Sequence, residues 1–108
     1  MRFEVLTIPP FEKQLKKLCK KYSSLKSEFA ELIESLETNP TRGTGLGNNC
    51  YKIRISIASK GKGKSGGARV ITHVKIIQRS VYLLSIFDKS ELENISDKEL
   101  KSLLEHIE

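Results

Sequence analysis

The chain of 108 residues carries 19 Lys and Arg against 13 Asp and Glu, which gives a formal net charge of +6. This length fits one domain over residues 1–108, and a hydrophobic share of 38% is enough for a modest core. No apolar run approaches the roughly 18 residues that a membrane span needs. The N-terminal segment has acids and prolines where a signal peptide has an apolar block. We therefore expect a cytoplasmic protein that does not associate with a membrane.

The charge is unevenly distributed along the sequence. Residues 38–87 contain no Asp or Glu, whereas the flanking segments together carry a net charge of −3. A segment this one-sided creates a positive surface wherever it folds, and its self-repulsion costs stability unless an anionic partner offsets it. We expect an anionic partner, with a solvated charged face as the alternative. The segment holds nine basic residues: Arg42, Lys52, Arg54, Lys60, Lys62, Lys64, Arg69, Lys75 and Arg79.

The N-terminal half predicts one strand and two helices. Residues 2–8 alternate loosely and end at a Pro-Pro pair, which is typical of a strand stopped by a turn. Apolar residues then recur at helical spacing over residues 11–22, with lysines on the remaining face. A Ser-Ser pair can cap a second helix over residues 25–37, whose outer face is rich in glutamates. Residues 41–49 contain three glycines and no periodicity, so they predict a loop.

The C-terminal half predicts three strands and a helix. Apolar residues alternate with Lys52, Arg54 and Ser56, which predicts a strand with one buried and one basic face. Residues 68–77 and 81–87 predict two more strands, the last apolar enough to lie centrally in a sheet. A capping-box sequence then opens a final helix. The order β-α-α-β-β-β-α predicts an α+β fold with a mostly antiparallel sheet packed against helices.

Lysines alternate with glycines in residues 59–67, between the first two of these three strands, and Arg69 follows. The segment lacks both the spacing and the following helix of a Walker loop. Glycines let a backbone approach a phosphate closely, and lysines supply mobile positive charges for it. We interpret the segment as a phosphate-contacting loop, with a solvated hairpin tip as the alternative.

The sequence shows no cluster of metal ligands. Cys19 and Cys50 are too few for a disulfide framework or a ligand set, and His73 and His106 are the only histidines. His73 falls within a predicted strand and could line its basic face, although a structural role is the alternative. The missing acids argue against paired-carboxylate and two-metal chemistry. We expect no metal and no cofactor, so phosphate chemistry would depend on Lys, Arg and hydroxyl groups.

Three runs of residues resemble a known family. They are Tyr51-Lys52-Ile53-Arg54, the lysine-glycine segment 58–71 with its GGxR tail, and residues 82–91. Together with the element order, they resemble the RelE/ParE superfamily of toxins from type II toxin–antitoxin systems, and within it the HigB-type branch of RelE. The likeness covers nearly the whole chain and implies a RelE-like fold.

The resemblance implies a ribosome-dependent endoribonuclease that enters the ribosomal A site, cuts mRNA and arrests translation. Such an mRNA interferase needs no metal, because the RNA 2′-OH attacks its neighbouring phosphate and leaves a 2′,3′-cyclic phosphate and a free 5′-OH. The resemblance also implies a cognate antitoxin, encoded by the adjacent gene and carrying a helix-turn-helix domain. We expect an acidic or amphipathic antitoxin segment to lie on or near the basic sheet face.

Residue roles follow from the resemblance by position. The catalytic residues would be Lys52, Arg54, Arg69 and Lys89, because cationic donors stabilise the charge on a pentacoordinate phosphate. RNA binding would fall to Lys60, Lys62, Lys64, Lys75, His73 and Phe87.

The chain departs from close HigB-type relatives at Phe87-Asp88, where they tend to carry Tyr-Gly. Phe87 could keep a stacking role but not a proton-transfer role, and Asp88 places an acid beside Lys89, so activity could be reduced. Two alternatives keep the same fold. One is a ParE-like gyrase inhibitor, and the other is a non-catalytic nucleic-acid-binding module.

Overall fold

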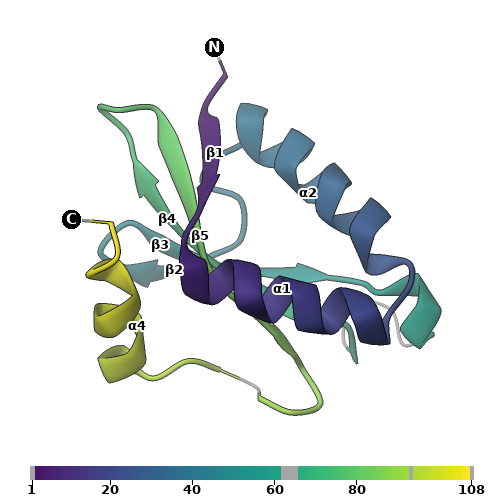
Figure 1. Cartoon of the computed structure of the whole chain (residues 1–108). Helices are drawn as coiled ribbons and strands as arrows, with labels where there is room; N and C mark the ends of the chain where they lie inside the picture. The colour runs from purple at the N-terminus through teal and green to yellow at the C-terminus, as the bar shows by residue number, and fades with distance from the viewer. Residues whose placement is uncertain (1, 62–65, 93, 108) are drawn as a thin grey trace.

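The computed structural model describes residues 2–61, 66–92 and 94–107 (Figure 1). Lys62 and Lys64 of the predicted phosphate-contacting loop lie outside the described residues. The elements are β1 (Glu4–Thr7), α1 (Pro9–Lys21), α2 (Leu25–Thr38), β2 (Thr44–Gly47), β3 (Cys50–Ile55), the 3₁₀ helix η1 (Ala58–Lys60), β4 (Ala68–Lys75), β5 (Ser80–Asp88) and α4 (Asp97–Leu104).

The strands form one sheet in the order β1-β5-β4-β3-β2. Neighbouring strands are antiparallel except β1 and β5, which are parallel. The helices α1 and α2 form a hairpin against one face of this sheet (Figure 1). The predicted α+β fold with a mostly antiparallel sheet is therefore confirmed. No helix within the described ranges is long and apolar enough to cross a membrane.

Strand β5 lies at the centre of the fold, as its near-continuous apolar sequence predicts. It pairs with β1 on one side and β4 on the other. Leu83, Leu84 and Ile86 are each at most 1% exposed, so side chains on both faces of the strand are buried. A strand covered on both faces needs apolar residues at consecutive positions rather than at alternate ones.

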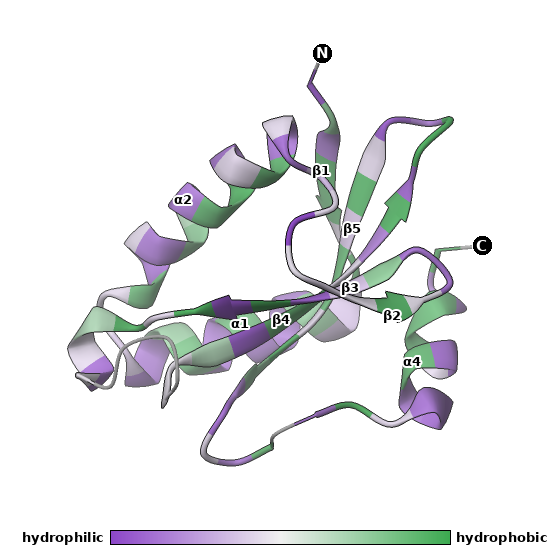
Figure 2. Cartoon of the chain, turned by 180° about the vertical axis from the view of Figure 1, so that it is seen from behind, coloured by the Kyte–Doolittle hydropathy of each residue, from purple (hydrophilic) through white to green (hydrophobic). Residues whose placement is uncertain are grey.

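The helices pack through one apolar stripe each. Phe11 and Leu18 of α1 and Leu25, Leu32 and Leu36 of α2 are buried, while the lysines and glutamates between them face outward. Figure 2 shows this as alternating hydrophobic and hydrophilic bands along both helices. The last helix, α4, begins at a cap in which the Ser96 hydroxyl accepts a hydrogen bond from the backbone of Glu99, as its capping-box sequence predicts.

Helix α1 also completes an edge of β5. Strand β1 pairs with β5 only as far as Leu83. Beyond that point the side-chain oxygen of Gln14 accepts hydrogen bonds from the Ile86 amide at 3.2 Å and the Ser85 hydroxyl at 3.1 Å. A buried backbone donor that the sheet leaves unpaired is satisfied in this way by a side chain.

Three boundaries differ from the sequence predictions. The prolines after β1 are the first residues of α1 rather than a turn, because the first turn of a helix does not use the amide hydrogen that proline lacks. Part of the predicted loop 41–49 is strand β2, whose pairing with β3 is a long-range contact that local propensity does not report. Strand β4 ends at Lys75, so Ile76 and Ile77 lie in the β4–β5 turn with exposures of 60% and 98%.

We expect Leu83→Ala to lower the free energy of unfolding by about 2–5 kcal/mol, because it leaves a cavity at the centre of the core. Ile77→Ala removes the same kind of side chain from an exposed turn and should change the free energy of unfolding by less than about 0.5 kcal/mol. Urea unfolding followed by circular dichroism measures both values. Equal losses in the two variants would contradict the central position of β5.

Candidate functional site

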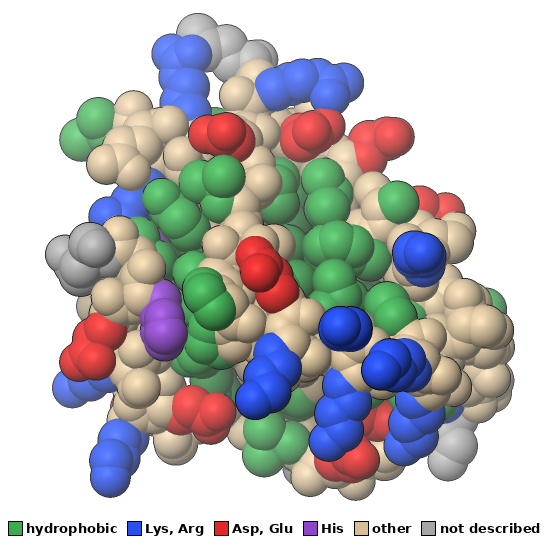
Figure 3. Space-filling view, viewed as in Figure 1, with side chains coloured by type: hydrophobic (Ala, Val, Ile, Leu, Met, Phe, Trp, Pro, Cys, Tyr) green, Lys and Arg blue, Asp and Glu red, His purple; other side chains and the backbone are tan. Residues whose placement is uncertain are grey.

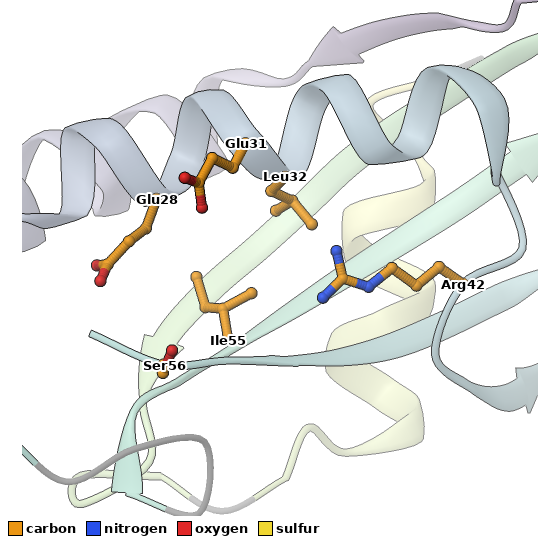
Figure 4. A pocket seen from close by; sticks show the side chains of 6 residues that line it. All are labelled: Glu28, Glu31, Leu32, Arg42, Ile55 and Ser56. Carbon is orange, nitrogen blue, oxygen red and sulfur yellow. The ribbon is translucent and has the colours of Figure 1, made fainter. Parts of the chain in front are cut away.

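The two faces of strand β3 differ in chemistry. Ile55 lines a hollow of about 170 Å³ together with Leu32 of α2, as Figure 4 shows, so this side of β3 faces the helices. Successive side chains of a strand point to opposite faces. Lys52 and Arg54 therefore project from the face of the sheet that α1 and α2 leave uncovered, as the alternation predicts.

A second strand adds a cation to this face. Arg69 of β4 is the direct cross-strand partner of Arg54, and Lys52 is paired with Ile71 in the same register. Directly opposed residues on antiparallel strands have their Cβ atoms about 4.5–5.5 Å apart, and like charges at such positions are destabilising. Arg54 is exposed, whereas Arg69 is only 4% exposed and donates from Nη1 to the Ala68 carbonyl at 3.1 Å. Such an arrangement of cations suits an anionic ligand.

Lys89 lies near the same end of the sheet. Arg69 is paired in register with Phe87 of β5, and Lys89 follows two residues later. The Lys89 amide donates to the Gly67 carbonyl at 3.0 Å, which places it beside the first residues of β4. The fold thus gathers the four residues predicted to be catalytic at one end of β3, β4 and β5.

Phe87 does not present its ring to solvent. It is 7% exposed and lines a hollow beside Gln14 and Leu18 of α1. A platform for a nucleobase needs an accessible ring face. The structure therefore assigns Phe87 to packing rather than to the predicted contact with RNA.

His73 and Lys75 lie at the other end of β4 from Arg69. Lys75 lies six positions after Arg69, which corresponds to about 20 Å along a strand. The His73 Nδ1 atom is 3.4 Å from the Sγ atom of Cys50, its cross-strand partner. Burial raises the pKa of the Cys50 thiol to about 11, so this thiol is protonated at neutral pH. The structure does not bring these two predicted RNA-binding residues to the end of the sheet that holds the residues predicted to be catalytic.

Lys60 forms a buried ion pair rather than a solvated contact point. Its side chain is 9% exposed and its Nζ donates to Oδ1 of Asp88, whose side chain is fully buried. The Tyr22 hydroxyl donates to Asp88 Oδ2 at 2.5 Å, and the Ser90 amide and hydroxyl donate to Oδ1 at 2.9 and 2.8 Å. Burial alone would raise the pKa of the Asp88 carboxyl. The hydrogen bonds from Lys60, Tyr22 and Ser90 outweigh it and hold that pKa well below its ordinary value of 3.8.

The helical hairpin holds η1 at the start of the lysine-glycine loop. The Ala58 amide donates to Oε2 of Glu28 at 2.6 Å, and the Ser59 amide donates to Oγ of Ser24 at 2.9 Å. Ser24 is the N-cap residue of α2, but its side chain makes no cap hydrogen bond to the helix backbone. Its hydroxyl contacts the Ser59 hydroxyl at 2.9 Å and donates to Oε1 of Glu28 at 3.1 Å. The first stem of the loop is therefore fixed to α2.

A close backbone contact fixes the second stem. A Cβ atom at Gly67 would lie 2.1 Å from the Ile55 carbonyl oxygen, so only glycine fits there. With the Lys89 amide on its carbonyl, Gly67 is held between β3 and the segment after β5. The residues on both sides of Lys62 and Lys64 are thus held by contacts within the fold, and those two lysines lie outside the described residues.

The nine basic residues of the acid-free segment do not form one surface. Arg42 turns toward α2, where its Nη1 donates to the Ser35 hydroxyl at 2.8 Å (Figure 4). Lys60 is neutralised by Asp88, and Lys75 and Arg79 border the distant β4–β5 turn. The nine basic residues therefore do not share a single face, and the end of the sheet with the residues predicted to be catalytic carries a smaller set of cations.

Sequence reasoning missed the network around Asp88. Its members come from α1, η1 and β5, so no local spacing connects them. One signal was available, because Asp88 is the first acid after 50 residues without one.

Among the described residues no group of three or more His, Cys, Asp or Glu could hold a metal ion.

Stability should fall in acid through Asp88. Its pKa is lower in the folded state than the 3.8 of an ordinary carboxyl, so the unfolded state takes up the proton first as the pH drops. The stabilisation is complete above about pH 5 and is lost progressively below pH 4. Asp88→Asn should be less stable at pH 7 by at least about 2 kcal/mol and should show a shallower loss between pH 5 and pH 2. Parallel pH dependences of urea unfolding in the two proteins would contradict this assignment.

Comparisons with known proteins agree with the fold. Residues 11–107 match the family model described as the RelE toxin of the RelE/RelB toxin–antitoxin system. The toxin–antitoxin complex RelBE2 from Mycobacterium tuberculosis matches with a TM-score of 0.60 and 18% identity, over 82% of this chain and 92% of that chain. A mutant of E. coli RelE in the free state matches with a TM-score of 0.54 and 21% identity, over 86% of this chain and 90% of that chain. Isolated E. coli RelE matches with a TM-score of 0.52 and 19% identity, over 95% of this chain and 97% of that chain.

The structural matches show the same fold, and the family model covers nearly the whole chain. The HigB-type branch is a finer assignment that these matches leave open. The chain belongs to the RelE toxin family of the RelE/RelB toxin–antitoxin systems.

Proposed function

We propose that this chain acts as a single toxin domain of the HigB-type branch of RelE, and that it cleaves mRNA on the ribosome in the cytoplasm without a metal ion. The observation that carries the proposal is the register of β3 and β4, which sets Arg54 opposite Arg69 on the same face as Lys52. Cations grouped on one face of a sheet can neutralise the phosphates of a bound RNA backbone.

The proposed reaction is an intramolecular transesterification of RNA. The 2′-OH loses its proton and attacks the adjacent phosphorus, and the bond from phosphorus to the 5′-oxygen breaks. The departing 5′-oxygen takes up a proton, so the products are a 2′,3′-cyclic phosphate and a free 5′-OH. We assign the stabilisation of the pentacoordinate phosphate to Arg54 and Arg69, because fixed cations act most strongly where negative charge develops. Lys52 lies on the same face and is proposed to transfer the proton, and Lys89 to clamp the phosphate from the end of β5.

The loop supports an RNA target more than a protein target such as gyrase. Its two stems are held by Ala58 and Gly67, at the same end of the sheet as the proposed catalytic residues. Lysines can pair with successive phosphates of an RNA backbone. We therefore propose that Lys62 and Lys64 contact ribosomal or messenger RNA, whereas Lys60 acts through its ion pair with Asp88.

The proposed partner is a cognate antitoxin encoded by the adjacent gene, with a helix-turn-helix domain. Its support comes from the family, because the similar solved structures include an intact E. coli RelBE toxin–antitoxin complex and E. coli RelE with a peptide of its antitoxin. A free toxin would stop growth of the cell that makes it, so a neutralising partner is a functional requirement of this activity.

Replacing the proposed catalytic pair tests the activity. Lys52→Ala/Arg54→Ala should lower codon-phased mRNA cleavage on translating ribosomes by at least about a hundredfold, because each phosphate-directed cation contributes roughly 2–4 kcal/mol to the transition state. Neither side chain is buried, so the fold should remain intact. Lys98→Ala/Lys101→Ala removes the same charge from α4 and should leave cleavage unchanged. Intact mRNA together with gyrase trapped on DNA would instead identify a ParE-like gyrase inhibitor.

The chemistry has its own test. An mRNA that carries one 2′-deoxynucleotide on the 5′ side of the cleaved bond lacks the proposed nucleophile, so cleavage at that bond should be abolished. The matched all-ribose mRNA should give a fragment that ends in a 2′,3′-cyclic phosphate, measured by mass spectrometry. Cleavage of the deoxy-substituted mRNA would show that water, rather than the 2′-OH, attacks the phosphate.

A further inference from the structure

The turn formed by residues 88–90, here called the clasp, joins parts of the chain that lie far apart in sequence. Its first residue, Asp88, ends β5 and binds Lys60 at the end of η1. Its second residue, Lys89, donates its amide hydrogen to the Gly67 carbonyl at 3.0 Å. The clasp therefore contacts the chain both before and after the segment that contains Lys62 and Lys64.

The Asp88 side chain closes this turn. Its Oδ1 atom accepts hydrogen bonds from the amide and the hydroxyl of Ser90 at 2.9 and 2.8 Å. An aspartate oxygen that binds the amide two residues later forms an Asx turn, which restricts the backbone of the residue between them. That residue is Lys89, the proposed clamp on the phosphate. The Asp88 carbonyl also accepts the amide hydrogens of Glu91 and Leu92 at 3.0 and 3.1 Å, so the chain after Lys89 is held as well.

The burial of this carboxylate exceeds what a turn requires, because Asx turns form readily at exposed positions. The Asp88 side chain is 0% exposed and that of Lys60 is 9% exposed. Figure 3 shows lysine side chains standing out from the surface over α1, so withdrawal of a lysine from solvent is not the general arrangement in this chain. A buried ion pair adds little stability over apolar residues of the same size, but it can specify one arrangement of the chain. Such precision is needed where a side chain must meet a reacting phosphate.

The clasp lies at the end of the sheet that holds the residues predicted to be catalytic. Lys89 stands two residues after Phe87, which is the cross-strand partner of Arg69. Gly67, which accepts the Lys89 amide hydrogen, stands two residues before Arg69. The backbone of Lys89 is therefore connected to that of Arg69 by two short paths, one along β5 and one through Gly67.

We propose that Asp88 is a positioning residue for RNA cleavage, an inference that rests on the function proposed above. Its carboxylate does not touch the RNA, because it is fully buried. It acts through Lys89, whose backbone the Asx turn holds so that the ammonium group meets the phosphate where negative charge develops. This role is the opposite of the loss of activity that was expected from an acid beside Lys89.

Two substitutions of Asp88 separate positioning from stability. Asp88→Ala and Asp88→Asn both remove the negative charge that pairs with Lys60, so both destabilise the fold. Only asparagine keeps a side-chain oxygen that can accept the hydrogen bonds of Ser90. We expect Asp88→Ala to lower the maximal rate of mRNA cleavage by at least about tenfold, because a misplacement of about 1 Å can cost about a hundredfold. The conservative Asp88→Asn should recover at least about a third of the wild-type rate.

The maximal rate is measured in single turnover, with the full chain in increasing excess over ribosomes that hold a defined mRNA. A variant that is merely less stable supplies less folded toxin, so it raises the half-saturating concentration and leaves the maximal rate unchanged. A misplaced Lys89 lowers the maximal rate, and the half-saturating concentration should stay within about threefold because Asp88 does not contact RNA. Equal maximal rates for Asp88→Ala and Asp88→Asn would overturn the proposal.

Lys89 provides a second readout. Lys89→Ala alone should lower the maximal rate by at least about tenfold, because it removes the proposed clamp. Once that side chain is absent, Asp88 has nothing left to position, so Lys89→Ala/Asp88→Ala should be within about threefold of Lys89→Ala. Losses that multiply would show that Asp88 acts independently of Lys89, which contradicts the proposed role.

Folding of each variant is checked by circular dichroism. If Asp88→Ala does not fold, the alanine and asparagine variants are compared in a Lys60→Met background, which removes the cation that would otherwise be left unpaired. The same difference in maximal rate is expected there, and its absence would overturn the proposal. If the wild-type chain cleaves mRNA and the two variants are equally fast, the proposed function stands and only the positioning role fails. If the wild-type chain leaves mRNA intact, the proposed function fails and the positioning role fails with it.

Discussion

The structure depends on a carboxylate that is completely removed from water. Burying the charge of Asp88 would be prohibitive without compensation, so its oxygens must be met by Lys60, Tyr22 and Ser90. These groups come from η1, from the end of α1 and from the segment after β5. The requirement to satisfy one charge therefore fixes where three separate parts of the chain meet. Because Lys60 begins the lysine-glycine loop, the same requirement sets the starting point of the loop next to the proposed catalytic residues.

The sequence pattern predicted those elements whose formation depends mainly on residues close together in the chain. The alternation around Ile53 and the apolar run of β5 correctly predicted which strand faces are buried, because burial determines where apolar residues stand along the sequence. Strand β2 escaped prediction because its glycine-rich sequence has no such period and forms a strand only through pairing with β3. The proline pair was misread for a related reason, since proline both ends a strand and begins a helix, and only the following residues decide between the two.

The candidate site was predictable to the extent that it follows strand alternation. Lys52 and Arg54 share a face for that reason, and Arg69 joins them through a register that sequence alone does not fix. The sequence did not predict the ion pair of Lys60, because a lysine in a polar segment has the same local sequence whether it is solvated or paired with a distant acid. The contact of Phe87 with RNA was expected from the resemblance, which does not report that this side chain is only 7% exposed.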